Sequence, residues 1–272
     1  MDVQSSHQLL DSPSVGIPAL RAGIQRFRIL DAPVDALDMS AALAFVDRCV
    51  RCADRSAIIL AVNPEKVYVL REDPRLKSLF DSAALLLPDG IGIVVAARLL
   101  HGASLKRTPG ADLMQSICSV APERGYRLFV LGASEDVNAG AVKELRCRFP
   151  GINIVGRCNG YWRPEDHSGI IQRINDSCAD ILFVALGSPQ QERWIEANVP
   201  HLNVKVCQGI GGTLDTIFGT VKRAPQAWQA LGLEWAYRLL RQPSRARRQL
   251  KLLSFVFEVL SQKLVRKASL EA

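Results

Sequence analysis

Clusters of small and polar residues follow several apolar, strand-like runs, and these are the positions at which the chain could do chemistry. In doubly wound sheets, ligands bind outside the carboxyl ends of the strands. Small residues there let a ligand approach backbone N–H groups at helix N-termini, which suits phosphate. The clusters are Asn63-Pro64-Glu65, Pro88-Asp89-Gly90, Gly132-Ala133-Ser134, Gly187 to Glu192 and Gly209 to Thr213. The candidate nucleotide-binding positions among them are Gly132, Gly187, Gly209, Gly211 and Gly212.

Each cluster also has a plainer interpretation when it is taken alone. The GIGG run departs from GxGxxG because Leu214 stands where a third glycine would be, so tight turns are favoured over a pyrophosphate site. Asp89 could be a general base, but without other evidence a turn or N-cap aspartate is favoured. Gln190, Gln191 and Glu192 could bind a sugar or nucleotide, or simply form a polar first helical turn.

The seven cysteines do not form a recognisable metal or disulfide pattern. They are odd in number and scattered through the chain, which indicates a reducing compartment. Cys49 and Cys52 form a lone CxxC in a helix-like stretch. Without a second pair or nearby histidines, ordinary helix packing is favoured over zinc binding.

Short apolar runs alternate with helix-like segments along most of the chain. Several runs are continuously apolar, as expected for strands covered by helices on both faces. The alternation with short loops predicts an α/β fold with a mainly parallel, doubly wound sheet. The expected strands cover residues 27–30, 57–62, 84–87, 126–131, 152–155, 181–186 and 204–208, and the expected helices lie near residues 39–52, 64–80, 91–100, 111–123, 135–148, 165–178 and 189–198.

The two ends of the chain differ from this α/β body, which we place at residues 26–220. Residues 1–25 are predicted to be a loose leader. Residues 221–272 have a purely helical pattern that Pro243 breaks or kinks. The net charge is +7, and nine of the 34 Lys and Arg residues but one of the 27 Asp and Glu residues lie between Arg238 and Lys267. This asymmetry indicates an anionic partner for the appendage: lipid headgroups, a diphosphate or nucleic acid.

No apolar run is long enough to cross a bilayer. The first residues are polar and lack the apolar region of a signal peptide. We therefore expect the protein to stay in the cytoplasm.

Six blocks of sequence follow one another in a specific order between about Phe27 and Arg248. Together they are far more specific than any single glycine motif, and they resemble the WecG/TagA/CpsF family, glycosyltransferase family 26. The blocks are VNPEKV (62–67), LPDGIGIV (87–94), RTPGADL (107–113), GSPQQERW (187–194), GIGGTLD (209–215) and KRAPQAWQALGLEWAYRLLRQPSRARR (222–248).

This resemblance implies a Rossmann-like glycosyltransferase fold with a C-terminal helical appendage that faces the membrane. It implies inverting transfer from a UDP-sugar to a saccharide linked to undecaprenyl or another polyprenyl diphosphate, in exopolysaccharide or cell-envelope polysaccharide synthesis. The expected location is the cytoplasmic face of the inner membrane, with peripheral attachment. No obligatory metal is implied.

The resemblance also assigns roles to individual residues. Asp89 matches the catalytic base, Arg107 the arginine before the G-x-D-L block and Gln191 the sugar-site glutamine. Asn63, in the Asn-Pro-Glu block, is a further candidate for binding substrate. The appendage arginines that are thought to grip the lipid diphosphate match Arg238, Arg245 and Arg248.

One position departs from the family pattern. Ala61 stands where members usually have a threonine, two residues before the Asn-Pro-Glu. The missing hydroxyl removes a potential hydrogen bond, so the donor could be UDP-glucose rather than a UDP-N-acetylmannosamine type.

The chain also lacks Asp-x-Asp, the usual pair that holds the divalent metal of a sugar-nucleotide donor. Such an enzyme needs other positive charge for the departing diphosphate, which Arg107 or the appendage arginines could supply. We therefore expect no bound metal at the site.

Two other classes of protein remain as alternatives. A nucleic-acid-binding module using the basic tail would need stacking aromatics or base readers, whereas the tail interleaves its cations with aliphatic residues and phenylalanine. We therefore expect no nucleic acid partner. A dinucleotide-dependent oxidoreductase would need GxGxxG after the first strand, and it is not found there. The appendage could also simply pack on its own body or on a second copy in a homo-oligomer.

Overall fold

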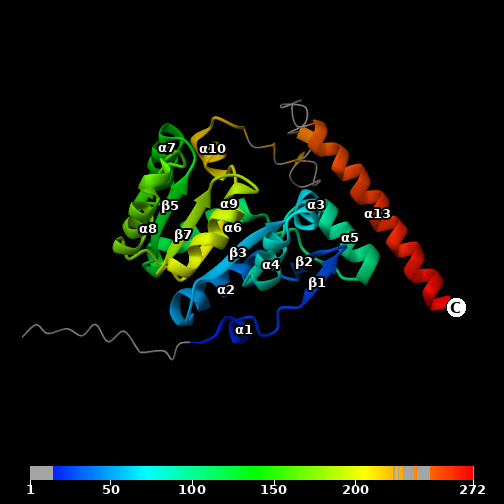
Figure 1. Cartoon of the computed structure of the whole chain (residues 1–272). Coiled ribbons are helices and arrows are strands. Elements are labelled where there is room, and N and C mark those ends of the chain that lie inside the picture. Colours follow the sequence, from blue (N-terminus) through cyan, green and yellow to red (C-terminus); the bar gives the residue numbers. More distant parts are fainter. Residues whose placement is uncertain are drawn as a thin grey trace, which may run out of the picture.

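A parallel sheet forms the centre of the molecule (Figure 1), and its six strands follow the order β4-β3-β8-β7-β5-β6. The computed structural model describes residues 15–222, 224–225, 227–228, 234, 236–237 and 246–271. The predicted α/β class with a mainly parallel sheet is confirmed. The strands are β3 (Ala57–Val62), β4 (Leu85–Pro88), β5 (Arg127–Gly132), β6 (Asn153–Cys158), β7 (Ile181–Ala185) and β8 (Val206–Gly209).

Helices cover both faces of this sheet, as the continuously apolar strands predict. Alternate strand residues point to opposite faces, so each strand contributes to two separate cores. One face packs against α1 (Ile17–Leu20), α2 (Met39–Cys52), α6 (Gly110–Arg124), α7 (Glu135–Arg148) and α10 (Thr213–Phe218). The other face packs against α3 (Pro64–Glu72), α4 (Pro74–Ser82), α5 (Ile91–His101), α8 (His167–Asp176), α9 (Gln190–Asn198) and α13 (Ala246–Glu271). Two short 3-10 turns, η1 (Pro164–Asp166) and η2 (Val199–His201), precede α8 and follow α9.

The helix expected at 64–80 is divided in two. Asp73 ends α3 and caps α4, because its carboxylate accepts hydrogen bonds from the backbone N–H groups of Arg75 and Leu76 at 3.1 and 3.3 Å. Pro74 occupies the first position of α4, where a missing N–H costs nothing. The short helix α10 was not predicted, since its six residues follow directly on the GIGG run.

The strand expected at 27–30 exists but does not belong to the parallel sheet. It is β1 (Arg26–Ile29), and it pairs antiparallel with β2 (Ala32–Asp35), a strand that the sequence did not predict. This hairpin lies beside β4, the outermost strand of the sheet at that end. It thereby covers an edge that would otherwise expose unpaired backbone groups.

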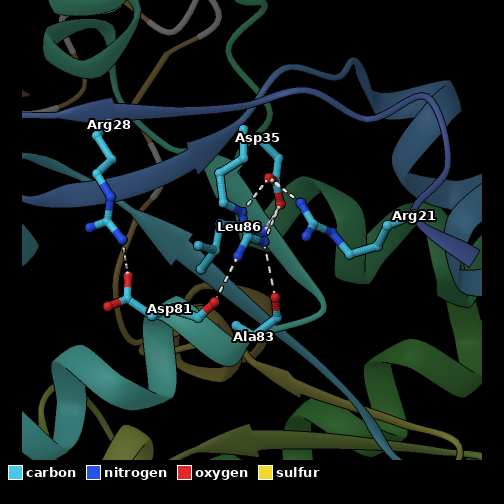
Figure 2. Close-up of polar contacts among 7 residues, drawn as sticks. Arg21, Arg28, Asp35, Asp81, Ala83 and Leu86 are labelled. Atoms are coloured by element: carbon cyan, nitrogen blue, oxygen red, sulfur yellow. Dashed lines mark hydrogen bonds and ion pairs between the residues drawn. The ribbon is translucent and has the colours of Figure 1, made fainter. Parts of the chain in front are cut away.

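A buried carboxylate fastens the hairpin to β4 (Figure 2). Asp35 is fully buried and accepts four hydrogen bonds: one from Arg21 at 2.8 Å, two from Arg26 at 2.7 and 2.8 Å, and one from the backbone N–H of Leu86 at 2.8 Å. Arg26 also donates to the backbone carbonyls of Asp81 and Ala83. This Asp35 cluster comprises Arg21, Arg26, Asp35 and the backbone around Leu86.

The expectation of a loose leader through residue 25 does not hold for residues 15–25. Ile17 and Leu20 of α1 are buried in the first core, and Val15 forms a bridge with Ala53. Arg21 joins the Asp35 cluster. The apolar side chains among the polar residues of this segment therefore serve to pack it on α2.

The C-terminal helix α13 packs on α5 and α3, near the β4 end of the sheet (Figure 1). Phe255 and Val259 are buried in the second core, and Leu252 and Phe255 lie against Gly92 of α5. None of the helices in the described parts of the chain is both long and apolar enough to span a membrane.

The outward side of α13 carries a second apolar stripe. Spacings of three and four residues place the members of this stripe on one face of the helix, away from Phe255 and Val259. These exposed residues are Leu253, Phe257, Leu260 and Leu264. One face of α13 is therefore core, and the other presents apolar side chains to solvent.

Candidate active site

Asp89 lies in the turn between β4 and α5, beside the end of β3. Its backbone N–H donates to the carbonyl of Val62 at 2.9 Å, which holds the turn against the neighbouring strand. Gly90, with φ of +104°, is the N-cap of α5 and makes no side-chain cap. Half-buried Asp89 is therefore a turn residue, one of its two plainer interpretations, and Gly90 rather than Asp89 is the N-cap of α5.

Asn63 occupies the equivalent position after β3. It is the N-cap of α3, and its side-chain oxygen accepts a hydrogen bond from the backbone N–H of Lys66 at 3.0 Å. The capping role explains why the sequence places asparagine before Pro64. It also leaves Asn63 at the same sheet edge as Asp89, since β3 and β4 are paired neighbours.

The N-terminus of α6 lies over the ends of three strands. The backbone N–H of Thr108 donates to the carbonyl of Pro88 at 2.9 Å, and Gln208 of β8 donates to the carbonyl of Gly110 at 2.8 Å. A Cβ added to Gly110 would lie 3.5 Å from the Cβ of Ala61, on β3. The N-cap residue Pro109 provides no side-chain cap, and the backbone N–H groups of this helix start carry partial positive charge, which Asp112 in the first turn offsets in part.

Arg107 directly precedes this helix start. Its guanidinium pairs with the carboxylate of Glu234 at 2.5 Å, and both side chains are largely buried. The ion pair joins the sheet domain to the C-terminal segment near the candidate site. The Glu234 carboxylate offsets the charge of Arg107, but the planar guanidinium at the start of α6 is a group that suits a diphosphate.

Gln191 lies at the ends of β7 and β8 and is almost fully buried. Its amide oxygen accepts a hydrogen bond from the backbone N–H of Gly211 at 2.8 Å, and its amide nitrogen donates to Glu192 at 2.9 Å. A Cβ added to Gly209 would lie only 3.0 Å from the Gln191 nitrogen. Gly211 has φ of +55°. The GIGG run thus forms a turn, the interpretation favoured for it when taken alone. Its glycines also leave space for the Gln191 side chain to lie against the backbone.

The other predicted glycines have separate structural reasons. A Cβ added to Gly132 would lie 2.3 Å from the carbonyl oxygen of Ala185, because β5 and β7 approach closely there. Gly187 has φ of +74° in the turn before α9. A Cβ added to Gly212 would lie 3.6 Å from the Asp215 carboxylate, an ordinary contact. Gly187 and Gly212 flank Gln191 at the same edge, whereas β7 separates Gly132 from β8.

The three appendage arginines are not positioned by these observations. Arg238 and Arg245 lie outside the described residues. Arg248 belongs to the first turn of α13, of which only the backbone is described. Their assignment to the lipid diphosphate stays a prediction.

One charged pair at this edge was not recognised from the sequence: Lys66 was missed as a functional candidate, and Glu192 was considered only as part of the run from Gln190 to Glu192. Lys66 and Glu192 form a buried ion pair between α3 and α9. A signal was present in the sequence, because each lies on the buried face of its helix: Lys66 is four residues before Leu70, and Glu192 is three before Ile195. The pattern therefore marks both residues as buried charges, but it does not show that they pair with each other.

The cysteines agree with helix packing. Cys49 is fully buried on α2, and burial raises the pKa of its thiol to about 12. The described residues contain no group of three or more histidine, cysteine, aspartate or glutamate side chains that could hold a metal ion.

Comparison with known protein families agrees with the order of these motifs. The profile of the glycosyl transferase WecG/TagA/CpsF family matches residues 27–269, from β1 to near the end of α13. The match includes the hairpin, every strand of the sheet and the C-terminal helix. The chain therefore belongs to the WecG/TagA/CpsF family of glycosyl transferases, enzymes of cell-surface polysaccharide synthesis.

Proposed function

We propose that this enzyme transfers a sugar, with inversion, from a UDP-sugar to a saccharide linked to a polyprenyl diphosphate. One observation supports the proposal: Asp89 follows β4, Gln191 contacts the turn after β8, and the start of α6 after Arg107 lies over the ends of β3, β4 and β8, all at the carboxyl edge of the sheet. Acid–base, sugar-binding and anion-binding groups are the three requirements of such a reaction. The alternatives of a nucleic-acid-binding module and an oxidoreductase have lost their support, since the family is one of glycosyltransferases.

The proposed reaction is a single displacement. The Asp89 carboxylate accepts the proton of the acceptor hydroxyl, whose oxygen attacks the anomeric carbon while UDP departs from the opposite face. UDP is a good leaving group and needs charge stabilisation more than a proton. The first turn of α6 and the Arg107 guanidinium would supply it. Since an ordinary aspartate is a weak base near neutral pH, we expect proton transfer to occur late, as the anomeric bond breaks.

Ala61 supports a proposal about the donor. Its side chain faces Gly110 at the start of α6, where a threonine hydroxyl could have bonded the donor or the acceptor. Losing that hydrogen bond favours a sugar that does not require it. We therefore propose UDP-glucose over UDP-N-acetylmannosamine.

A donor competition assay tests this function. Purified full-length protein is incubated with both UDP-sugars and a short-chain polyprenyl-diphosphate-linked saccharide, and the product's anomeric configuration is determined by NMR. We expect transfer from UDP-glucose, inversion at the anomeric carbon, and activity that persists in excess chelator. Preference for UDP-N-acetylmannosamine would refute the donor proposal. Loss of activity restored only by Mg²⁺ or Mn²⁺ would refute the metal-free mechanism.

The exposed stripe on α13 supports peripheral attachment to the inner leaflet. Four large apolar side chains on one helix face suit shallow insertion among lipid headgroups. The surrounding Lys and Arg residues of this tail would add about 1 kcal/mol each on an anionic surface, screened by salt. Lipid attachment would bring the enzyme to its membrane-bound acceptor.

Vesicle sedimentation tests this attachment. In vesicles with anionic lipids, we expect the double variant Phe257→Ser/Leu264→Ser to bind much more weakly than the wild type. Tyr161→Ser is the matched control, because it removes an exposed aromatic residue far from α13 in the chain. Equal binding of all three proteins would show that the stripe contacts something other than lipid.

A further inference from the structure

Lys66 and Glu192 form an ion pair that is buried below the candidate site. Their residues are 6% and 1% exposed. The lysine belongs to α3, which follows β3, and the glutamate belongs to α9, which follows β7. The Lys66 ammonium donates to Glu192 Oε1 and also to the hydroxyl of Ser188. Since β8 lies between β3 and β7, the pair bridges the two sides of the strand that ends in the GIGG turn.

The same carboxylate oxygen orients Gln191. Glu192 Oε1 accepts the hydrogen bond from the amide nitrogen of Gln191, whose oxygen faces the N–H of Gly211. Glu192 provides an acceptor for the amide nitrogen, and the Gly211 N–H provides a donor for the amide oxygen. Together they fix which way the Gln191 amide is turned. A primary amide has two N–H donors and two lone pairs. Among the described residues one of each is used, by Glu192 and Gly211, and we assign the other N–H and the other lone pair to a ligand.

Stability alone does not account for this arrangement. Desolvation makes a buried ion pair a poor stabiliser, and well-packed apolar residues often replace one at no cost. The bonds to Lys66 and Gln191 both fall on Oε1, while Oε2 of Glu192 is buried without a hydrogen-bond partner among the described residues. A buried group left incompletely paired calls for an explanation other than packing.

We propose that Lys66 and Glu192 are positioning residues for glycosyl transfer. Lys66 holds the Glu192 carboxylate in place, and Glu192 holds Gln191 so that its remaining N–H and lone pair meet the sugar. The inference rests on the proposed function, in which Gln191 binds the sugar. The rival explanation is that the pair only clamps α3 to α9.

Two uncharged double variants separate these explanations. Lys66→Met/Glu192→Met removes both charges and the acceptor for Gln191, whereas Lys66→Met/Glu192→Gln removes both charges but keeps an acceptor oxygen. Neither leaves a buried charge without its partner, so we expect both to fold and to unfold at similar temperatures. Single variants would be less informative, because each strands one charge in the interior.

We expect the Met/Met variant to lose roughly 10- to 100-fold in kcat/KM, because a misoriented binding group costs about this much. The Met/Gln variant should recover most of that loss. Equal activity of the two variants would overturn the positioning role, since a clamp does not distinguish them.

Gln191→Ala distinguishes failure of this inference from failure of the proposed function. We expect it to impair transfer strongly, and the Met/Met changes to add little in that background because they act through Gln191. Full activity of Gln191→Ala would overturn the sugar-binding role on which the inference rests. Impaired Gln191→Ala together with equal activity of the two double variants would overturn the positioning role alone.

Discussion

Two buried carboxylates in this enzyme, those of Asp35 and Glu192, differ in how completely they are hydrogen-bonded. Asp35 lies between the hairpin and β4 and receives four hydrogen bonds, shared between its two oxygens (Figure 2). Glu192 lies below the carboxyl edge of the sheet and has two donors on one oxygen and none among the described residues on the other. Both are at most 1% exposed, so burial does not separate them.

The difference lies in what each carboxylate holds. The donors to Asp35 come from Arg21, which directly follows α1, and from β1 and β4, so this fully paired carboxylate fixes three backbone segments relative to one another. The donors to Glu192 are side chains, and one of them, Gln191, faces the candidate site. Complete pairing marks a cluster that stabilises the fold, and incomplete pairing marks one that is retained for another reason.

The largest effect on turnover should come from Asp89, at the edge that Glu192 supports. Asp89→Asn keeps the shape of the side chain and removes its basicity, so turnover should fall by about 10²–10⁴ with UDP binding largely preserved. Turnover is measured by transfer from the UDP-sugar, and binding by calorimetry with UDP. Turnover near that of the wild type would remove Asp89 from the mechanism and would leave this edge without a base.

Asp35→Asn, by contrast, should lower the stability of the fold and leave turnover unchanged. The change leaves Arg21 and Arg26 without their shared anion and should lower the free energy of unfolding by about 3–5 kcal/mol. Urea unfolding measures this loss, and turnover per folded molecule should not change. Arg28→Gln is the matched control, because its pair with Asp81 is exposed and should contribute less than about 1 kcal/mol (Figure 2). Reduced turnover in folded Asp35→Asn would contradict the conclusion that the Asp35 cluster serves the fold alone and that only the Glu192 pair serves the site.

Most of the parallel sheet could be predicted because its strands are continuously apolar. AIILAV at 57–62 and ILFVA at 181–185 permit little else when helical patterns flank them. The hairpin could not be predicted in the same way, because β2 contains Pro33 and ends at Asp35, and both residue types are depleted in strands. β2 is a strand through its pairing with β1, and a tertiary contact, that of Asp35 with Leu86 51 positions later in the chain, attaches it to the sheet.

In the candidate site, too, some positions follow from the local sequence pattern and others only from the tertiary structure. Asp89 and the GIGG turn follow predicted strands directly, so their place at the sheet edge came from the pattern of elements. Lys66 and Glu192 are 126 positions apart, and only the strand order brings them together across β8. That order is a property of the crossovers, which local propensity does not encode.

A third group of charges, half-exposed, joins the hairpin to α13 and differs from both buried clusters. Arg71 of α3 pairs with Asp31, in the hairpin turn, and with Glu258 of α13, each at 2.7 Å. Glu258 also accepts a hydrogen bond from the hydroxyl of Tyr68 at 3.1 Å. Because solvent reaches these groups, we expect them to adjust the docking of α13 rather than to determine it.

The smallest expected effect is a change in how Tyr68 titrates. Burial, and then the hydrogen bond to the Glu258 carboxylate, raise the pKa of Tyr68 from 10.0 to about 12. A folded pKa above the unfolded value means that the neutral hydroxyl is the form that docked α13 favours. Its contribution to stability is therefore complete below pH 10 and is lost as the pH rises from 10 to about 12.

Glu258→Gln separates the two causes of this shift. It removes the negative charge beside the hydroxyl but leaves the burial, so the pKa of Tyr68 should fall only part of the way back towards 10.0. The change in tyrosinate absorbance with pH measures this, with Tyr68→Phe subtracted to remove the other tyrosines. An unchanged midpoint in Glu258→Gln would mean that α13 does not hold its carboxylate against Tyr68 in solution. The packing of α13 on α3 would then depend on its apolar face, with Phe255 and Val259 as its anchors, and on the contacts of Lys251 with Glu72 and Tyr68.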